Sequence, residues 1–287
     1  MTLALMAGEG ALPGALLAEM ADRARDVLLC ELRGHPIAPE LRAGRPVLTF
    51  RLETLGSFIA DLRARSVSAI CFAGRVSRPE IDPAQIDAAT KPLVPRMAQA
   101  LQAGDDTALR VLAALFEEAG IQVSGVGDLA PGLLASEAVL TRAAPAEIAR
   151  TDAGRGMDII AALAAVDVGQ ACVVADGQAL AVEATAGTDW MLGTLTPSGE
   201  ADDWAAARLQ RAKAAYGGAR GGVLVKAAKP GQDLRFDLPT VGPETVDAAA
   251  RAGLAGIVVE AGRVLILERE TMIGAADAAG LFIWARG

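Results

Sequence analysis

The sequence predicts an α/β protein with an N-terminal Rossmann-like parallel-sheet domain and a C-terminal mixed α/β domain. Short apolar runs of strand length alternate with helical segments along the first part of the chain. The composition is 52% hydrophobic but only 3% aromatic, which favours helices packed on sheets through many small contacts. A length of 287 residues is sufficient for two domains that each bury a core of ordinary size.

The N-terminal part, residues 1–130, alternates strands and helices in chain order. The expected strands are short apolar runs at residues 3–7, 27–32, 47–50, 68–73 and 121–123. The expected helices lie at about residues 13–25, 54–65, 93–102 and 105–119, and Gly120 stands where a helix ends. This alternation predicts a mostly parallel sheet that is covered by helices on both faces.

Periodicity is lost over residues 125–145, and we place a linker at residues 131–145 and a catalytic α/β domain at residues 146–287. Asp176-Gly177 between two apolar runs predicts a hairpin of residues 171–175 and 178–184. Further strands are expected at residues 223–226, 256–259, 264–267 and 281–284. Helices are expected at about residues 156–165, from residue 190, from 243 to Gly253, and at 271–279.

Charge and hydropathy exclude several classes of function. The net charge of −8 makes extensive binding of a nucleic-acid backbone unfavourable, so no nucleic-acid partner is expected. No stretch reaches the about 20 apolar residues that span a bilayer, and the start lacks the basic region of a signal peptide. A cytoplasmic location is therefore expected.

The sequence contains only three cysteines and one histidine, which limits the catalytic and metal sites that these residue types could form. Cys30, Cys71 and Cys172 lie far apart in apolar runs and are expected to be core thiols. His35 is the single histidine, and its Gly-His-Pro setting predicts a surface loop. Catalysis is therefore expected to depend on carboxylates, lysine, arginine and a metal rather than on a serine–histidine triad.

Gly8-Glu9-Gly10 follows the first expected strand and precedes a helix, where backbone amides and the helix N-terminus can receive a phosphate. Glu31 ends the second strand about 20 residues later, where a dinucleotide fold has its ribose-binding acid. Pro13 stands where the third glycine of that fingerprint is expected. A nucleotide or diphosphate contact, a nicotinamide cofactor and a structural turn all remain open.

Two further segments carry charge at strand or helix ends. Arg75 and Arg78 leave the end of an apolar strand and could clamp a diphosphate with Ser77 as a donor; a solvated loop is the alternative. Asp105 and Asp106 begin a helix, where one aspartate suffices as a cap and the other could contact a metal or a ribose.

Residues 221–246 concentrate charge around one short run that is expected to be extended. Alternation predicts two faces, an apolar one with Leu234, Phe236 and Leu238 and a polar one with Asp233, Arg235 and Asp237. Carboxylates hold a hard divalent cation, and Arg235 with Lys226 and Lys229 suits phosphate oxygens. A solvated edge with a structural Asp–Arg pair is the alternative.

Seven motifs together resemble the LpxI family, the UDP-2,3-diacylglucosamine pyrophosphatases of lipid A biosynthesis. They are GEGALP from Gly8, AGRVSRP from Ala73, GDD from Gly104, DVGQ from Asp167, AVEATAGTDWML from Ala181, KAAKPGQDLRFDLPTVGPETV from Lys226 and AGLAGIVVEAG from Ala252. The resemblance covers essentially the whole chain, and the long run from Lys226 is the most specific part of it.

The resemblance implies hydrolysis of UDP-2,3-diacylglucosamine to UMP and 2,3-diacylglucosamine 1-phosphate (lipid X), with Mg²⁺ or Mn²⁺. We expect Asp237 to be the central catalytic residue and metal ligand, with Asp233 in a supporting role at the same metal. The expected substrate-binding residues are Gly8, Gly10, Arg75, Ser77, Arg78, Thr188, Asp189, Lys226, Lys229, Arg235 and Thr240. The resemblance also implies a possible acidic cluster that faces Lys226, Lys229 and Arg235 and consists of Glu183, Asp189, Asp233 and Asp237. An acyl-chain surface could be lined by Trp190, Met191, Leu192 and Trp204, although core packing is favoured for Met191 and Leu192.

A diacylated substrate beside a chain with no expected spanning segment implies peripheral contact with the inner membrane. We expect the substrate to be held between the two domains, and a homodimer is left open. Two other classes of function remain: a non-catalytic protein that binds a nucleotide sugar or lipid, and a Rossmann oxidoreductase.

Overall fold

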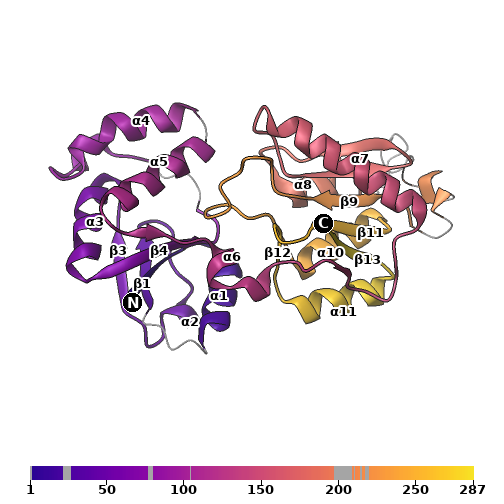
Figure 1. The fold of residues 1–287 in the computed structure, drawn as a ribbon, viewed down its shortest axis with the longest axis horizontal. Helices are drawn as coiled ribbons and strands as arrows, with labels where there is room; N and C mark the ends of the chain where they lie inside the picture. The colour runs from indigo at the N-terminus through magenta and orange to yellow at the C-terminus, as the bar shows by residue number, and fades with distance from the viewer. Residues whose placement is uncertain are drawn as a thin grey trace. The chain divides into compact units, whose positions relative to one another are not determined.

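The computed structural model describes residues 2–21, 27–76, 80–103, 105–196, 209, 211–213, 215–216 and 220–287. These residues form two compact units (Figure 1). Unit 1 comprises Met1–Gly132 together with Asp233–Asp237, and unit 2 comprises Leu133–Gln232 together with Leu238–Gly287. The chain therefore passes from unit 2 back to unit 1 for the five residues Asp233–Asp237, and then re-enters unit 2 at Leu238.

Unit 1 contains a five-stranded sheet in the order β3-β2-β1-β4-β5, and every pair in it is parallel. Its strands are β1 (Thr2–Ala7), β2 (Val27–Leu32), β3 (Val47–Phe50), β4 (Val67–Ala73) and β5 (Gln122–Val123). Strands with both faces buried read as continuous apolar runs, which explains why these runs predicted the sheet. The strand order reverses between β1 and β4, the position at which open α/β sheets bind ligands beyond the carboxyl ends of their strands.

Helices cover both faces of this sheet, with α1 and α6 on one face and α3 and α5 on the other (Figure 1). The α-helices of unit 1 are α1 (Leu12–Met20), α2 (Pro39–Arg42), α3 (Leu55–Ala64), α4 (Val94–Ala103), α5 (Asp105–Glu118) and α6 (Val126–Leu129). Short 3-10 helices occupy Leu52–Thr54, Pro83–Gln85, Lys91–Leu93 and Pro131–Leu133. The core includes Phe58 of α3, Ile70 of β4 and Phe116 of α5, and Phe236 from the returning segment packs against it.

Unit 2 contains a six-stranded mixed sheet in the order β6-β13-β11-β9-β7-β8 and a two-stranded parallel sheet of β10 and β12. The strands are β6 (Ala138–Val139), β7 (Ala171–Ala175), β8 (Gln178–Val182), β9 (Val223–Lys226), β10 (Thr240–Val241), β11 (Gly256–Glu260), β12 (Leu265–Ile266) and β13 (Phe282–Arg286). The three central strands β13, β11 and β9 are parallel, whereas β7 and β6 pair antiparallel to them. The predicted α/β class is confirmed.

The helices of unit 2 are α7 (Glu147–Ala164), α8 (Gly187–Gly193), α10 (Pro243–Ala252) and α11 (Arg269–Ala279). One face of the sheet packs against α7 through Ala149, Ala153 and Ile160. The other face packs against Leu192 of α8, Val246 of α10 and Met272 of α11. Gly156 allows α7 to approach the sheet closely, because a Cβ there would lie 2.4 Å from a methyl carbon of Val225.

Most expected elements are present, with shifted ends. The hairpin around Asp176-Gly177 is confirmed, with φ of 52° and 73° at its two central residues. Helix α7 begins nine residues before the expected start. The side chains in its first turns are mostly small or polar, so they show no apolar period. Within residues 131–145, assigned to a linker, lie a 3-10 turn and the short strand β6.

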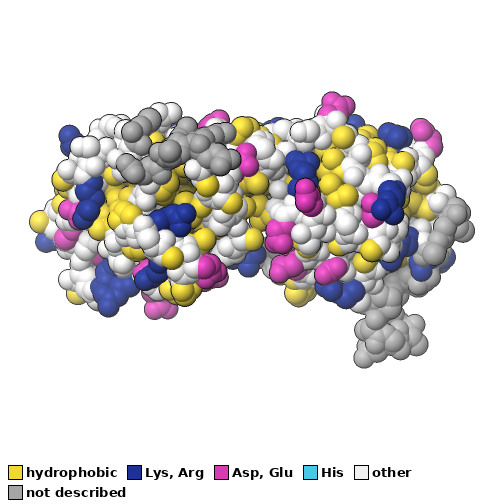
Figure 2. Space-filling model, turned by 90° about the horizontal axis from the view of Figure 1, so that it is seen from below, with side chains coloured by type: hydrophobic (Ala, Val, Ile, Leu, Met, Phe, Trp, Pro, Cys, Tyr) yellow, Lys and Arg dark blue, Asp and Glu magenta, His cyan; other side chains and the backbone are white. Residues whose placement is uncertain are grey.

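The three cysteines are free and buried, as predicted for core thiols. Burial raises the pKa of each thiol to about 12, which keeps it protonated and unreactive at neutral pH. Among the described residues, no helix is both long enough and apolar enough to cross a membrane. On the face drawn in Figure 2, basic, acidic and hydrophobic side chains are interspersed, and the residues that it colours form no continuous basic surface.

Candidate functional site

The loop after β1 and the loop after β4 are joined by backbone hydrogen bonds. The Glu9 N–H donates to the Arg75 carbonyl at 2.8 Å, and the Arg75 N–H donates to the Glu9 carbonyl at 2.9 Å. The Gly8 N–H donates to the Ala73 carbonyl at 2.8 Å. Three of the predicted binding residues, Gly8, Gly10 and Arg75, therefore lie together at the point where the strand order reverses. Ser77 and Arg78 lie outside the described residues.

This pairing changes the role that the sequence suggested for the glycine loop. The amides of Gly8 and Glu9 were expected to receive a phosphate, but they are used to join the two loops. Glycine is needed at position 8 for a different reason, because a Cβ there would lie 2.4 Å from the Arg75 carbonyl oxygen. Gly10 has a φ of +95°, a left-handed conformation that favours glycine.

Replacing Gly8 by alanine should push the two loops apart. We expect Gly8→Ala to lower the free energy of unfolding by about 2 kcal/mol, because a Cβ cannot fit against backbone atoms that are already hydrogen-bonded. Gly14→Ala is the matched control, since its Cβ would meet only Leu41 at an ordinary 3.5 Å within helix α1. Urea unfolding of both variants tests this, and equal stabilities would contradict it.

Glu31, at the end of β2, is already engaged within unit 1. Its carboxylate accepts a hydrogen bond from the Ile37 N–H at 2.9 Å and forms an ion pair with Arg42. The carboxylate therefore fastens the segment after β2 instead of presenting two free oxygens to a ribose. This weakens the Rossmann oxidoreductase alternative, for which Glu31 was the main sequence feature.

The Asp233–Asp237 segment is a turn, and the prediction of an extended run is wrong here. The Phe236 N–H donates to the Asp233 carbonyl at 3.2 Å, a bond between residues three apart that an extended chain cannot make. Asp233 also accepts from the Arg235 N–H at 3.1 Å, the local bond that short aspartate side chains make in turns. The alternating apolar and polar faces expected from Leu234 to Leu238 therefore do not form.

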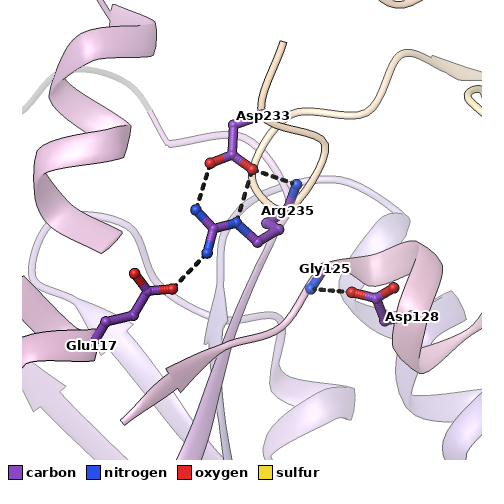
Figure 3. A network of polar contacts seen from close by, with 5 residues as sticks. All are labelled: Glu117, Gly125, Asp128, Asp233 and Arg235. Carbon is purple, nitrogen blue, oxygen red and sulfur yellow. Dashed lines mark hydrogen bonds and ion pairs between the residues drawn. The ribbon is translucent and has the colours of Figure 1, made fainter. Parts of the chain in front are cut away.

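Arg235 pairs with one carboxylate inside the turn, Asp233, and with one on helix α5, Glu117 (Figure 3). Its Nε and Nη2 donate to the two oxygens of Asp233 at 2.9 and 2.7 Å, and its Nη1 donates to Glu117 of α5 at 2.5 Å. Beside it, Phe236 lies 5.0 Å from Phe72, measured between ring centroids. The absence of a side chain at Gly125 leaves room for the Arg235 backbone. Arg235 was expected either to bind phosphate oxygens or to form a structural pair with an aspartate, and the structure shows the pair with Asp233.

These contacts set the charge of the turn. The hydrogen bonds from Arg235 hold the pKa of Asp233 below its ordinary value, and Asp233 in turn raises the pKa of Arg235. Asp233 is therefore a carboxylate whose two oxygens both accept from one guanidinium, which makes it a poor proton acceptor. Asp237, at the end of the turn, is exposed to solvent.

The lowered pKa of Asp233 predicts a dependence of stability on pH. A depressed pKa favours the folded state above the ordinary value of 3.8, and this contribution is lost as pH falls through the folded value. We expect Asp233→Asn to lower the unfolding free energy by about 1 kcal/mol at neutral pH, the upper range for a partly exposed pair. The difference from the natural protein should shrink as the pH falls below 3.8. Urea titrations check this, with the exposed Asp247→Asn as the control that shows no such change.

In unit 2, three residues that the sequence singled out form one buried polar chain. Lys226 Nζ, at the end of β9, donates to the Thr188 hydroxyl at 2.9 Å, and that hydroxyl donates to Glu183 at 2.5 Å. The second Glu183 oxygen accepts from the Gln170 N–H at 2.8 Å. Lys226, Thr188 and Glu183 are each less than one-tenth exposed. Their arrangement fixes a positive charge at the carboxyl end of a parallel strand.

The DVGQ segment from Asp167 and the segment after Lys226 contact each other beside the buried Lys226–Thr188–Glu183 group. Lys229 forms an ion pair with Asp167, and the Ala227 N–H donates to the Gln170 carbonyl at 3.0 Å. Gly169 has a φ of +58°, and a Cβ there would lie 2.1 Å from the Glu183 carbonyl oxygen. The DVGQ segment therefore fits closely against the strand ends only because its third residue is glycine.

The remaining predicted residues are less connected. Asp189 is exposed at the start of α8, whereas Glu183 is buried. Trp204 lies outside the described residues. Thr240 lies in β10, and its hydroxyl donates to the Leu238 carbonyl at 3.1 Å. Nothing is described of Gly104 or of the side chains of Asp105 and Asp106. Within the described part of the chain, no group of three or more histidine, cysteine, aspartate or glutamate side chains could hold a metal.

Two residues near these groups were missed or misplaced by sequence reasoning. Glu117 binds Arg235 across 118 positions of sequence, which no local pattern could indicate. His35 was expected in a surface loop, but it is only 7% exposed, so that prediction is wrong. Gly-His-Pro correctly indicated a turn, but a turn can be covered by other loops.

The fold and these groups define a class: a two-unit α/β protein whose charged side chains gather in loops at strand ends, as in nucleotide-binding α/β proteins. The family model of the LpxI N-terminal domain matches residues 2–133, and that of the LpxI C-terminal domain matches residues 136–284. The chain belongs to the LpxI family. A curated relative from Caulobacter vibrioides (strain ATCC 19089 / CIP 103742 / CB 15), UDP-2,3-diacylglucosamine pyrophosphatase LpxI, is 37% identical over 281 residues, which cover 98% of this chain and 96% of the relative.

Proposed function

We propose that the chain hydrolyses the diphosphate of UDP-2,3-diacylglucosamine, as the name of the Caulobacter relative states for that protein. The observation that carries the proposal is the 37% identity over 98% of this chain. In this reaction the oxygen of water forms a bond to one phosphorus and the P–O bond of the anhydride bridge breaks. The products are UMP and 2,3-diacylglucosamine 1-phosphate.

A divalent metal, Mg²⁺ or Mn²⁺, is part of the proposal. Mg²⁺ in phosphate chemistry is often held by one or two protein carboxylates, with substrate oxygens and water completing its shell. Asp237 fits that requirement because it is exposed to solvent, where water and substrate oxygens can reach a bound ion. Both oxygens of Asp233 accept from Arg235. We therefore assign the metal to Asp237 and give Asp233 the role of fixing the turn. The metal would neutralise charge on the phosphoryl oxygens.

The protein's own residues supply orientation and positive charge. Lys226 is held by Thr188 and Glu183 at a defined place, so its ammonium group needs no reorganisation to meet a phosphate oxygen. Lys229 and Arg75 are further phosphate-binding candidates, although Lys229 forms an ion pair with Asp167. Asp237 is proposed to position the attacking water as well as the metal.

Acyl-chain contact is proposed for unit 2. Trp190 is 64% exposed on α8, two residues after Thr188, and Val182 is 37% exposed at the end of β8. Large apolar side chains at the surface beside a charged cluster suit a diacylated sugar phosphate. Such contacts would support peripheral association with the inner membrane from the cytoplasmic side.

Release of UMP from UDP-2,3-diacylglucosamine with Mg²⁺, with Mn²⁺ and with a chelator tests the function. We expect release only with metal. Binding of the substrate without release would favour the non-catalytic alternative, and NAD(H) retained on purification would favour the oxidoreductase.

A further inference from the structure

His35 presents a buried nitrogen to the loop that follows β1. The residue lies in the turn after β2, where its N–H donates to the Leu32 carbonyl at 2.9 Å. Its side chain is 8% exposed, and Nδ1 has no hydrogen-bond partner among the residues that the structure describes. Buried polar nitrogens are rarely left without a partner, because their lost hydration is then not compensated. Nδ1 is thus a group suited to a ligand atom.

The nearest charged group comes from the neighbouring loop. Glu9 Oε1 lies 4.0 Å from His35 Nδ1, and the Glu9 side chain is 61% exposed. A distance of 4.0 Å is too long for a direct hydrogen bond. It is suitable for two atoms that both bind one oxygen at ordinary hydrogen-bond lengths of about 2.8 Å.

The hydrogen-bonding chemistry of Glu9 and His35 indicates which kind of ligand oxygen can bind to both side chains. A carboxylate only accepts hydrogen bonds, while the Nδ1–H tautomer of a neutral imidazole donates one. A hydroxyl satisfies both groups, since it donates to Glu9 and accepts from His35. A fully ionised phosphate oxygen could accept from His35 but would be repelled by Glu9. A metal ion would find only these two ligands, because no larger group of suitable side chains is present among the described residues.

We propose that Glu9 and His35 bind a ribose hydroxyl of the substrate's nucleoside, an inference that rests on the proposed function. The loops after β1 and β2 are where doubly wound sheets place a nucleotide ribose. The acid that would ordinarily bind this ribose, Glu31, is engaged by Ile37 and Arg42. Glu9 and His35 supply the acceptor and the donor in its place.

Because His35 is the single histidine, its imidazole resonances can be followed by NMR without assignment of other residues. The full chain is titrated with UMP, with 2′,3′-dideoxyuridine 5′-monophosphate and with inorganic phosphate. We expect UMP to shift the imidazole signals in a saturable manner. The dideoxy analogue should bind at least about tenfold more weakly, because a site built for a hydroxyl leaves its own polar groups unpaired without it.

Two variants test the pair separately. His35→Phe keeps a ring of similar size but removes Nδ1, and Glu9→Ala removes the carboxylate; each should lower the preference for UMP over the dideoxy analogue by about tenfold. Glu40→Gln changes an exposed carboxylate of α2 and should keep the preference. If His35→Phe does not fold, Glu9→Ala and the natural protein still decide the result.

The proposal is overturned if UMP does not bind, if saturating UMP leaves the His35 signals unchanged, or if both nucleotides bind equally. Metal-dependent UMP release is measured in parallel on the same preparations. Release without a hydroxyl preference rejects this inference and keeps the proposed function, whereas a preference without release rejects hydrolysis and keeps the nucleoside site.

Discussion

Asp237→Ala is expected to lower turnover of UDP-2,3-diacylglucosamine by at least about 100-fold while the protein still folds and binds substrate. Loss of the carboxylate removes the proposed metal ligand and the group that positions water, which act more on the transition state than on the bound substrate. The affinity should survive because Lys226, Lys229 and the apolar surface of unit 2 are unchanged.

Folding should survive because other residues of the turn anchor it. Arg235 joins Asp233 to Glu117, and Phe236 packs against Phe72. Asp237 itself is exposed, and surface substitutions usually change stability by less than about 0.5 kcal/mol. A defect in turnover can therefore be separated from a defect in folding.

Asp237→Asn and Asp247→Ala complete the experiment. Asp237→Asn keeps the shape of the side chain without its charge and should be nearly as defective as Asp237→Ala. Asp247→Ala removes an exposed carboxylate from α10 and should release UMP at the normal rate. Single-turnover release and substrate binding are measured for each. Near-normal release by a folded Asp237→Ala protein would exclude this residue from the mechanism.

Asp152→Ala is expected to lower the unfolding free energy of unit 2 by about 3 kcal/mol. Asp152 is fully buried on α7, and its carboxylate accepts three hydrogen bonds. The donors are the Tyr216 hydroxyl at 2.6 Å and the backbone N–H groups of Asp176 and Gly177 at 2.8 and 2.7 Å. Alanine would leave all three donors without their acceptor and release the turn of the β7–β8 hairpin.

Tyr216→Phe and Asp158→Ala calibrate this result. Tyr216→Phe removes one of the three donors and should cost about 1 kcal/mol. Burial and the bond to Asp152 raise the pKa of Tyr216, so its hydroxyl stays protonated over the range used for unfolding. Asp158→Ala removes an exposed carboxylate from the same helix and should change stability little. Urea unfolding checks the series, and an Asp152→Ala protein as stable as Asp158→Ala would contradict the structural role.

The sequence by itself determined most elements whose signals lie within a few residues of one another. Continuous apolar runs identified β1, β2 and β4. Gly120 and Gly253 ended helices in the left-handed conformation, with φ of 80° and 79°. These features depend on backbone sterics and local hydrogen bonds, which the identity of neighbouring residues fixes directly. The α/β class followed from their order along the chain.

Part of the candidate site could also be anticipated. Lys226 belongs to the charged run at residues 221–246, and the family resemblance implied a substrate-binding role for Thr188. That the Thr188 hydroxyl joins Lys226 to Glu183 could not be read from spacing, since it depends on which strands become neighbours in the sheet.

Only the tertiary structure decided the conformation of Asp233–Asp237 and the burial of His35. The alternating pattern of the segment favoured a strand, but a strand needs a neighbour to pair with, and here the partners are the side chains of Glu117 and Phe72. His35 is buried by a local turn placed beside the loop that carries Glu9. Both outcomes depend on contacts between segments far apart in sequence, which form only when the sheet order brings their loops together.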